Sequence, residues 1–147
     1  MTPSSLLALP KRKQRNSPEF HLHVAVVQHL RLAALPGVAF FHPANGEARS
    51  ARTGGRLKAM GVVPGVGDLV VLVEGVAGML ELKKHGGRQT PEQKLFQKRW
   101  EKAGGRYEVA DGIDTALAVL VRWKALPEGY GFVPSRRLQP SLAFEAA

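Results

Sequence analysis

Residues 65–93 read GVGDLVVLVEGVAGMLELKKHGGRQTPEQ. Two short apolar runs in this stretch, Leu69–Val73 and Met79–Leu82, are separated by a small segment that contains glycine. This pattern is typical of two strands joined by a turn. Successive side chains of a strand point to opposite faces, so we expect Glu81 and Lys83 on one face and the neighbouring leucines on the other.

The charged residues of this stretch indicate a binding site on the hairpin. A carboxylate and an ammonium group on one face of an apolar strand are costly to bury without a purpose. Asp68 precedes the first run, and its carboxylate can reach Glu81 and Lys83 if the two runs pair. Two carboxylates and a lysine suit Mg²⁺, which takes carboxylate, water and phosphate oxygens as ligands. The alternative interpretation is a surface salt bridge among the three side chains.

The composition is that of one ordinary globular domain. The chain has 147 residues, enough for a single core, and 44% of them are apolar. It contains no cysteine, which excludes disulfides and thiolate metal sites. No apolar run approaches the roughly 20 residues of a membrane helix, and the N-terminus lacks the apolar segment of a secretory signal. We therefore expect no membrane contact and a cytoplasmic location.

The charge balance favours an anionic partner. There are 21 Lys and Arg residues against 12 Asp and Glu residues, a net charge of +9. Such an excess is typical of proteins that bind polyanions, although solubility alone is an alternative explanation. An acidic cluster inside a basic chain is more informative, because it suggests that the basic residues surround a phosphate-handling centre.

Helices and further strands flank the hairpin. Ser17 and Pro18 form a helix start, and Thr90 and Gln93 form a capping-box pattern that opens a second helix. The other elements follow from apolar periodicity and from glycine or proline breaks. Together they predict an α/β fold with a mixed sheet of about four strands flanked by helices. The predicted order is a helix over 18–35, strands over 38–42, 69–73 and 79–82, a helix over 90–103, a strand over 106–110 and a helix over 114–126.

The first two predicted helices each have a face for the sheet. In the first, Val26 and Leu30 lie on one stripe with Glu19 and His23, which aims the carboxylate of Glu19 inward near one end. The alternative for Glu19 is a first-turn acid that complements the helix dipole. The second helix is predicted to face the core with Leu95, Phe96, Arg99 and Trp100, and to face solvent with Lys94, Lys98 and Lys102.

A basic segment lies between the first strand and the hairpin. It is predicted as a loop over 43–58, because Gly54 and Gly55 allow unusual backbone shapes. Guanidinium and backbone N–H groups of such a loop approach phosphates closely; a mobile surface loop is the alternative. One helical turn is expected over 57–60, closed by Gly61. The candidate DNA contacts are Arg49, Arg52, Arg56 and Lys58, with Lys84 and Arg88 after the hairpin.

The two ends of the chain are predicted to lie outside the folded domain. Residues 1–16 include KRKQR and lack apolar periodicity, which is typical of a flexible basic arm. Residues 127–147 contain glycine and proline and are expected to form an extended tail. Residues 17–126 would then form the single folded domain.

The central stretch resembles a known family of nucleases. An acidic residue before one strand, followed by Glu-x-Lys on the next, is similar to the PD-(D/E)XK motif, here Asp68 and Glu81 to Lys83. The longer segments LKAMGVVPGVGDLVVL, ELKKHGGRQTPEQ and GGRYEVA resemble the VRR-NUC branch of that superfamily. The resemblance covers roughly residues 18–120. One departure is Gly67, where the family usually has proline before the aspartate.

The resemblance implies a restriction-endonuclease-like sandwich with a metal-dependent nuclease site. Asp68 and Glu81 would hold Mg²⁺ or Mn²⁺, with the backbone carbonyl of Leu82 as a further ligand. Lys83 would orient a water molecule and stabilise charge in the transition state.

Two further active-site positions are implied by the resemblance. A glutamate on the first helix belongs to the family's active site, so Glu19 would bridge to a second metal or position a water molecule. Gln93 corresponds to a glutamine next to the active site and would orient the water or a phosphate. The alternative for Gln93 is that it only caps its helix.

The resemblance also implies DNA as the substrate, and branched DNA such as a four-way junction or a flap. The sequence contains no base-reading motif, which fits recognition of shape through phosphate contacts. A two-fold-symmetric junction would suit a homodimer, in a bacterial or phage setting. Two alternatives stay open: a restriction-like endonuclease that reads sequence through residues 43–58, and a non-catalytic DNA-binding subunit.

Overall fold

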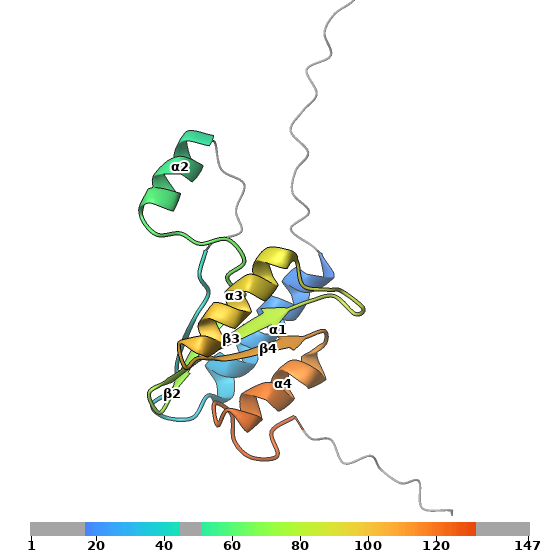
Figure 1. The fold of residues 1–147 in the computed structure, drawn as a ribbon. Coiled ribbons are helices and arrows are strands. Elements are labelled where there is room, and N and C mark those ends of the chain that lie inside the picture. Colours follow the sequence, from blue (N-terminus) through green and yellow to red (C-terminus); the bar gives the residue numbers. More distant parts are fainter. Residues whose placement is uncertain (1–16, 45–50, 132–147) are drawn as a thin grey trace, which may run out of the picture.

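The structure is a computed structural model, and it describes residues 17–44 and 51–131. The predicted basic arm, Arg49 and the tail beyond residue 131 lie outside the described residues. Figure 1 shows how the helices and strands are arranged. Their order is α1 (Pro18–Ala33), β1 (Ala39–Phe41), α2 (Ala51–Ala59), β2 (Leu69–Val73), β3 (Val76–Leu82), α3 (Pro91–Lys102), β4 (Arg106–Ala110) and α4 (Ile113–Arg122).

The strands form one mixed sheet in the order β1-β2-β3-β4. The pairs β1–β2 and β2–β3 are antiparallel, and β4 pairs with β3 in parallel. The connection from β3 to β4 runs through α3, because a parallel pair needs a long crossover. This four-stranded mixed sheet flanked by helices confirms the predicted fold class.

The hairpin of β2 and β3 is present, but its turn is shorter than predicted. Glu74 and Gly75 have φ angles of 50° and 78°, and they form a two-residue turn between the paired Val73 and Val76. Positive φ at both positions gives a turn whose twist matches that of the flanking strands. The second strand therefore begins at Val76 instead of Met79.

One face of the sheet carries the hydrophobic core against α1 and α4. Leu69 and Leu80 are opposite each other in the hairpin and are completely buried. Burying a leucine contributes roughly 1.5–3 kcal/mol relative to leaving it exposed. The other main contributors to the core are Val71, Val73, Leu82 and Ala110 from the sheet, with Val26, Leu30, Leu117, Leu120 and Trp123 from the helices and the turn after α4.

α1 begins as the sequence predicts. The hydroxyl oxygen of Ser17 accepts a hydrogen bond from a first-turn backbone N–H at 3.2 Å, and Pro18 occupies the first helical position. The helix ends at Ala33 instead of Leu35. The reason is tertiary, because the N–H of Leu35 donates to the carbonyl of Ala125 at 2.9 Å and so does not continue the helix.

α3 lies across the other face of the sheet (Figure 1), and its rotation differs from the prediction. Leu95 is 52% exposed and Arg99 is also exposed, so neither belongs to the inward stripe. Trp100 donates its indole N–H to the carbonyl of Arg106 at 2.8 Å and stacks on Phe96, which turns the helix about its axis. The half-buried stripe consists of Gln93, Phe96, Gln97 and Trp100. The outward lysines are exposed, as predicted.

The segment predicted as a loop over 43–58 contains a helix instead. α2 includes Gly54 and Gly55 in its interior, and neither has a positive φ angle. The prediction was wrong because glycine lowers helix stability by only about 1 kcal/mol relative to alanine. The neighbouring arginine, leucine, lysine and alanine residues favour a helix. The helix closes as predicted at Gly61, which has a φ angle of 94°.

α4 ends at Arg122, earlier than the predicted Leu126. Lys124 has a φ angle of 62°, and the N–H groups of Ala125 and Leu126 both donate to the carbonyl of Leu120. This turn folds the chain back so that both residues are buried in the core. Within 17–44 and 51–131, no helix has the length and apolar character needed to cross a membrane.

Candidate active site

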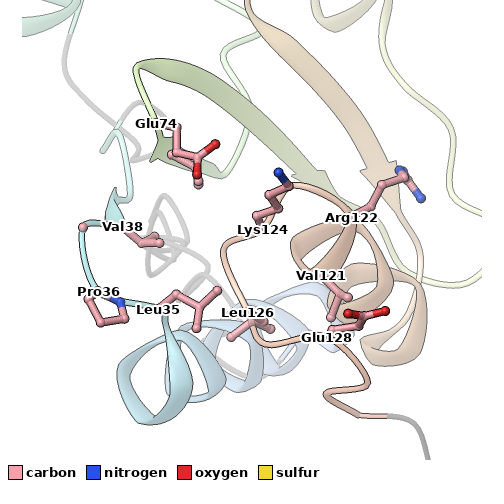
Figure 2. A pocket seen from close by; sticks show the side chains of 11 residues that line it. Leu35, Pro36, Val38, Glu74, Val121, Arg122, Lys124, Leu126 and Glu128 are labelled. Carbon is pink, nitrogen blue, oxygen red and sulfur yellow. The ribbon is translucent and has the colours of Figure 1, made fainter.

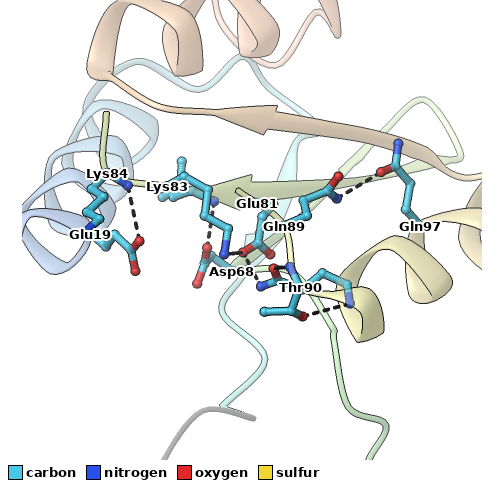
Figure 3. Close-up of polar contacts among 10 residues, drawn as sticks. Glu19, Asp68, Glu81, Lys83, Lys84, Gln89, Thr90 and Gln97 are labelled. Carbon is cyan, nitrogen blue, oxygen red and sulfur yellow. Dashed lines mark hydrogen bonds and ion pairs between the residues drawn. The ribbon is translucent and has the colours of Figure 1, made fainter. Parts of the chain in front are cut away.

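The hairpin brings the acidic motif residues together. Leu69 pairs with Leu80, so Asp68 and Glu81 are opposite each other and share the face of the sheet that α3 covers. Lys83 lies two residues further along that face, with its ammonium nitrogen 3.0 Å from Oε1 of Glu81. Figure 3 shows the three side chains converging on one point.

The backbone of β3 anchors Asp68. Its Oδ2 accepts a hydrogen bond from the backbone N–H of Leu82 at 2.7 Å, and its own N–H donates to the carbonyl of Leu80 at 3.0 Å. Burial raises the pKa of the Asp68 carboxyl group, against the opposing effect of the Leu82 N–H. The position of this carboxylate is therefore set by the strand that carries Glu81.

Glu81 is buried, with 2% of its surface exposed. Its Oε1 contacts the ammonium group of Lys83 and accepts a hydrogen bond from the amide of Gln93 at 2.6 Å. Its other oxygen, Oε2, is buried and has no hydrogen-bond partner among the described residues. Burial, followed by the charge of Asp68, raises the pKa of Glu81 to about 7, even though Lys83 opposes the shift.

These features fit a divalent cation. A buried oxygen without a partner is costly, and a cation between Asp68 and Glu81 would satisfy it and allow both carboxylates to ionise. Within the described ranges, no three His, Cys, Asp or Glu side chains are grouped to hold a metal. Backbone, water or phosphate oxygens would complete the ligand set, which suits Mg²⁺ better than a structural Zn²⁺.

Gln93 links the N-terminus of α3 to the site. Its Oε1 accepts from the backbone N–H of Thr90 at 2.8 Å, and its own backbone N–H donates to the Thr90 hydroxyl at 3.2 Å. These two bonds complete the predicted capping box. Since its amide also donates to Glu81, one side chain both caps the helix and reaches the carboxylate.

Glu19 lies at the rim of the site (Figure 3). It is exposed, and its Oε1 accepts a hydrogen bond from the backbone N–H of Lys84 at 3.3 Å. Its charge adds to the raised pKa of Glu81, but none of the described contacts joins it directly to Asp68 or Glu81. Lys84 and Arg88, both candidate DNA contacts, follow Lys83 closely in the sequence, and their side chains are exposed.

Two histidines, His23 and His42, lie beside Asp68 in the structure, and the sequence did not predict this contact. His42, which follows β1, donates from Nδ1 to the backbone carbonyl of Asp68 at 2.6 Å. Its ring contacts that of His23 from α1 edge to face, with the centroids 4.6 Å apart. Burial lowers the pKa of His23, against the opposing charge of Asp68. The one indication in the sequence was that His42 lies at the end of a predicted strand. Local sequence does not show which strand pairs with that one, so it does not show that His42 reaches Asp68.

Tyr107 is a second residue that sequence reasoning did not identify. It lies on β4 beside Met79 and is 6% exposed. Its hydroxyl group lies close to Gln89 and Glu81, but no contact in the described part of the chain has hydrogen-bond geometry. Burial, followed by the charge of Glu81, raises the pKa of this hydroxyl above its usual range, so it stays protonated. Nothing in the alternating strand distinguishes it from an ordinary core aromatic.

An open cleft of about 380 Å³ leads to Glu81. Gly65 has a φ angle of 81°, and a Cβ at this position would collide with the backbone carbonyl of Glu92, so the segment before β2 packs directly on α3. The cleft is lined by His42, Pro43, residues 63–68, Glu81, Thr90, Glu92 and Gln93.

A larger cavity, of about 760 Å³, lies at the opposite end of the sheet (Figure 2). It is bounded by Leu35 to Val38, by the turn at Glu74 and by the end of α4 near Arg122. Its lining contains none of the candidate site residues. The size of a cavity therefore does not locate the acidic cluster in this molecule.

The fold is shared with solved structures. No protein-family model and no curated protein sequence matches the chain. A structure described as a "VRR_NUC domain protein" is 22% identical, with a TM-score of 0.60, over 74% of this chain and 88% of that chain. Another, described as a "VRR_NUC domain", is 19% identical, with a TM-score of 0.50, over 73% of this chain and 97% of that chain. The chain thus has the fold of VRR-NUC domains, which confirms the fold that the resemblance implied.

Proposed function

We propose that the chain is a metal-dependent endonuclease that hydrolyses phosphodiester bonds in DNA. The observation that carries this proposal is the buried, unpartnered Oε2 of Glu81, next to Asp68 and Lys83. Such a carboxylate pair supports the binding of a cation, and a cation with a fixed lysine supports attack on a phosphodiester. The shared fold with VRR_NUC structures supports the same class of reaction.

The central residues would divide the work between metal binding and charge stabilisation. Asp68, Glu81 and the backbone carbonyl of Leu82 would hold Mg²⁺ or Mn²⁺. The ion, when bound, would lower the pKa of the attacking water and neutralise charge on the phosphoryl oxygens. Lys83 would orient that water and stabilise the negative charge that develops in the transition state.

Gln93 and Glu19 would support this centre from two sides. Gln93 would act as a positioning residue, because its amide engages Oε1 of Glu81 and leaves Oε2 for the cation. Glu19 would position a water molecule or bridge to a second ion from the rim, where the backbone N–H of Lys84 holds its carboxylate.

We propose branched DNA, such as a four-way junction or a flap, as the substrate. The net charge of +9 supports a polyanionic partner, and the lack of a base-reading motif in the sequence supports recognition of shape. A two-fold-symmetric junction would be cut by a homodimer, with one site for each of two equivalent strands.

The proposal is tested by cleavage of a labelled four-way junction, a flap and a linear duplex, each with Mg²⁺, Mn²⁺ or EDTA. Wild-type protein is expected to cut the branched substrates only with metal. Glu81→Ala is expected to abolish cleavage and leave DNA binding largely intact. The matched control is Glu108→Ala, because Glu108 is a half-buried strand glutamate that pairs with Arg122 away from the site.

Each alternative gives a different result in this assay. Full activity of Glu81→Ala would contradict the metal assignment. Cleavage of one sequence in the linear duplex would favour a restriction-like enzyme. DNA binding without cleavage in any metal would favour a non-catalytic subunit.

A further inference from the structure

α2 differs from the other helices because it stands apart from the sheet (Figure 1). Of the side chains described in this helix, only that of Leu57 is half-buried, and the rest, Arg52 to Arg56 and Lys58 to Ala59, are exposed. The helix therefore buries almost no surface against the body of the protein. Its stability has to come from its own sequence or from a partner.

The sequence of α2 supports only a marginal helix by itself. The helix has nine residues, whereas isolated helices shorter than about 12–15 residues are marginal in water. Gly54 and Gly55 weaken it further. Its C-terminus has good local bonds, because the N–H of Val62 donates to the carbonyl of Leu57 and the N–H of Gly61 donates to that of Lys58. One closed end does not replace the missing packing, so a bound partner would add more to the stability of this helix than the rest of the chain does.

The charge of α2 identifies the chemistry of that partner. Arg52 and Arg56 are four residues apart and so lie on one face of the helix, whereas Lys58, two residues after Arg56, lies on the other side. Residues 51–59 contain no acidic side chain that could pair with them inside the helix. The two arginines on one face, without an internal counter-charge, complement neighbouring phosphates of a nucleic-acid backbone, and Lys58 adds positive charge to the same helix.

Both ends of the segment that carries α2 arise at the acidic cleft. On one side, His42 binds the backbone carbonyl of Asp68, and Pro43 lines the cleft. On the other side, Val63 and Pro64 line the same cleft. A nucleic-acid strand bound at Glu81 would therefore have its adjoining duplex within reach of this segment.

We infer that α2 is a DNA-binding arm that is stabilised as a helix by the phosphates of the duplex next to the cleaved bond. This inference rests on the proposed function and names the contact that holds the substrate. It replaces the predicted glycine loop with a helix as the phosphate-binding element. A second copy of the chain and an RNA duplex are the other occupants that the test separates.

The first test removes the charges of the arm. Binding of a labelled DNA duplex is measured over a range of salt concentrations in EDTA, so that no cleavage is needed. The triple variant Arg52→Ala, Arg56→Ala, Lys58→Ala should weaken binding at least about tenfold and reduce the slope of log K against log salt by about 2–3. The matched control replaces Lys94, Lys98 and Lys102 of α3, which are also exposed, and should change the slope by less than about 1.

The second test changes the helix without changing its charge. A Cβ at Gly54 or Gly55 would meet nothing within 4 Å, so alanine fits at both positions. The double variant Gly54→Ala, Gly55→Ala should tighten DNA binding by roughly three- to tenfold, because less ordering remains to be done on binding. Gly55→Pro should weaken binding, because proline breaks a helix interior.

The outcomes separate this inference from the proposed function. An unchanged salt slope in the triple variant, or an equal change in the α3 control, would contradict DNA binding by α2, even if wild-type protein cuts DNA. Unaltered DNA binding by Gly55→Pro would contradict the inference that α2 is helical when it binds DNA. A change in oligomeric mass with an unchanged slope would assign α2 to a second copy, and tighter α2-dependent binding to duplex RNA would assign it to RNA. Failure of cleavage with intact α2-dependent binding would contradict only the proposed function.

Discussion

The two faces of the β2–β3 hairpin have opposite character. On one face, Leu69 and Leu80 are fully buried in the core against α1 and α4. On the other, Asp68, Glu81 and Lys83 form a charged cluster, in which Glu81 and Lys83 are buried and Oε2 of Glu81 has no hydrogen-bond partner among the described residues. The first face stabilises the fold, whereas the burial of charge on the second opposes folding. Because side chains alternate along a strand, the same two strands place the core leucines on one face and the charged residues on the other.

The largest effect is expected on the core face. Leu80→Ala should lower the free energy of unfolding by about 2–5 kcal/mol, because it removes a fully buried side chain and leaves a cavity. Denaturant unfolding measures this change. The matched control is Leu72→Ala on the same hairpin, where the leucine is 42% exposed and the loss should be less than about 1 kcal/mol. Equal losses at the two positions would contradict the assignment of the faces.

On the charged face, Lys83→Ala should act on turnover. We expect a fall of about 10²–10³ in kcat, the usual cost of removing one group that stabilises transition-state charge. Mg²⁺ affinity should change little when measured at about pH 8.5, above the raised pKa of Glu81. Lys98→Ala on the exposed face of α3 serves as the control. If weaker metal binding is the main effect, Lys83 has a structural role.

The destabilising character of the charged face should be visible as a pH dependence. The pKa of Glu81 is raised from 4.5 to about 7 in the folded protein, so folding is favoured by its protonated form. This stability is fully present below about pH 4.5 and is lost as the pH rises through about 7. Relative to Glu81→Gln, metal-free wild-type protein should therefore lose roughly 3 kcal/mol over that range.

Urea unfolding in EDTA at a series of pH values measures this difference. Glu101→Gln, an exposed glutamate on α3, is the control and should follow the wild type. Mg²⁺ should reduce the wild-type loss above pH 7, because it binds the ionised carboxylates. If the free energy of unfolding changes with pH in the same way for wild type and Glu81→Gln, the pKa of Glu81 is not raised in the folded protein.

Local patterns predicted the elements that depend on local physics. The hairpin and the common face of Glu81 and Lys83 follow from the two-residue period of a strand. The helix starts at Ser17 and Thr90 follow from side-chain oxygens that satisfy first-turn N–H groups. In each case the responsible atoms lie within a few residues of one another, so the sequence contains the whole argument.

Predictions that depended on a partner surface were less successful. The inward stripe of α3 was predicted to include Leu95, but the bonds of Trp100 to Arg106 and of Gln93 to Glu81 turn the helix and leave Leu95 exposed. These contacts join α3 to β3 and to the start of β4, so the apolar periodicity of the helix alone could not predict them. The loop predicted in place of α2 failed for a related reason, because two glycines weaken a helix without forbidding it.

The sequence by itself determined the fold class, the hairpin and the face on which Asp68, Glu81 and Lys83 lie, because period, caps and turns are local properties of the chain. Only the tertiary structure decided how buried Glu81 is, that its pKa rises to about 7, and that His42 contacts Asp68. Those properties depend on the solvent excluded by α3 and on the register of β1 with β2, and both arise only when distant segments pack.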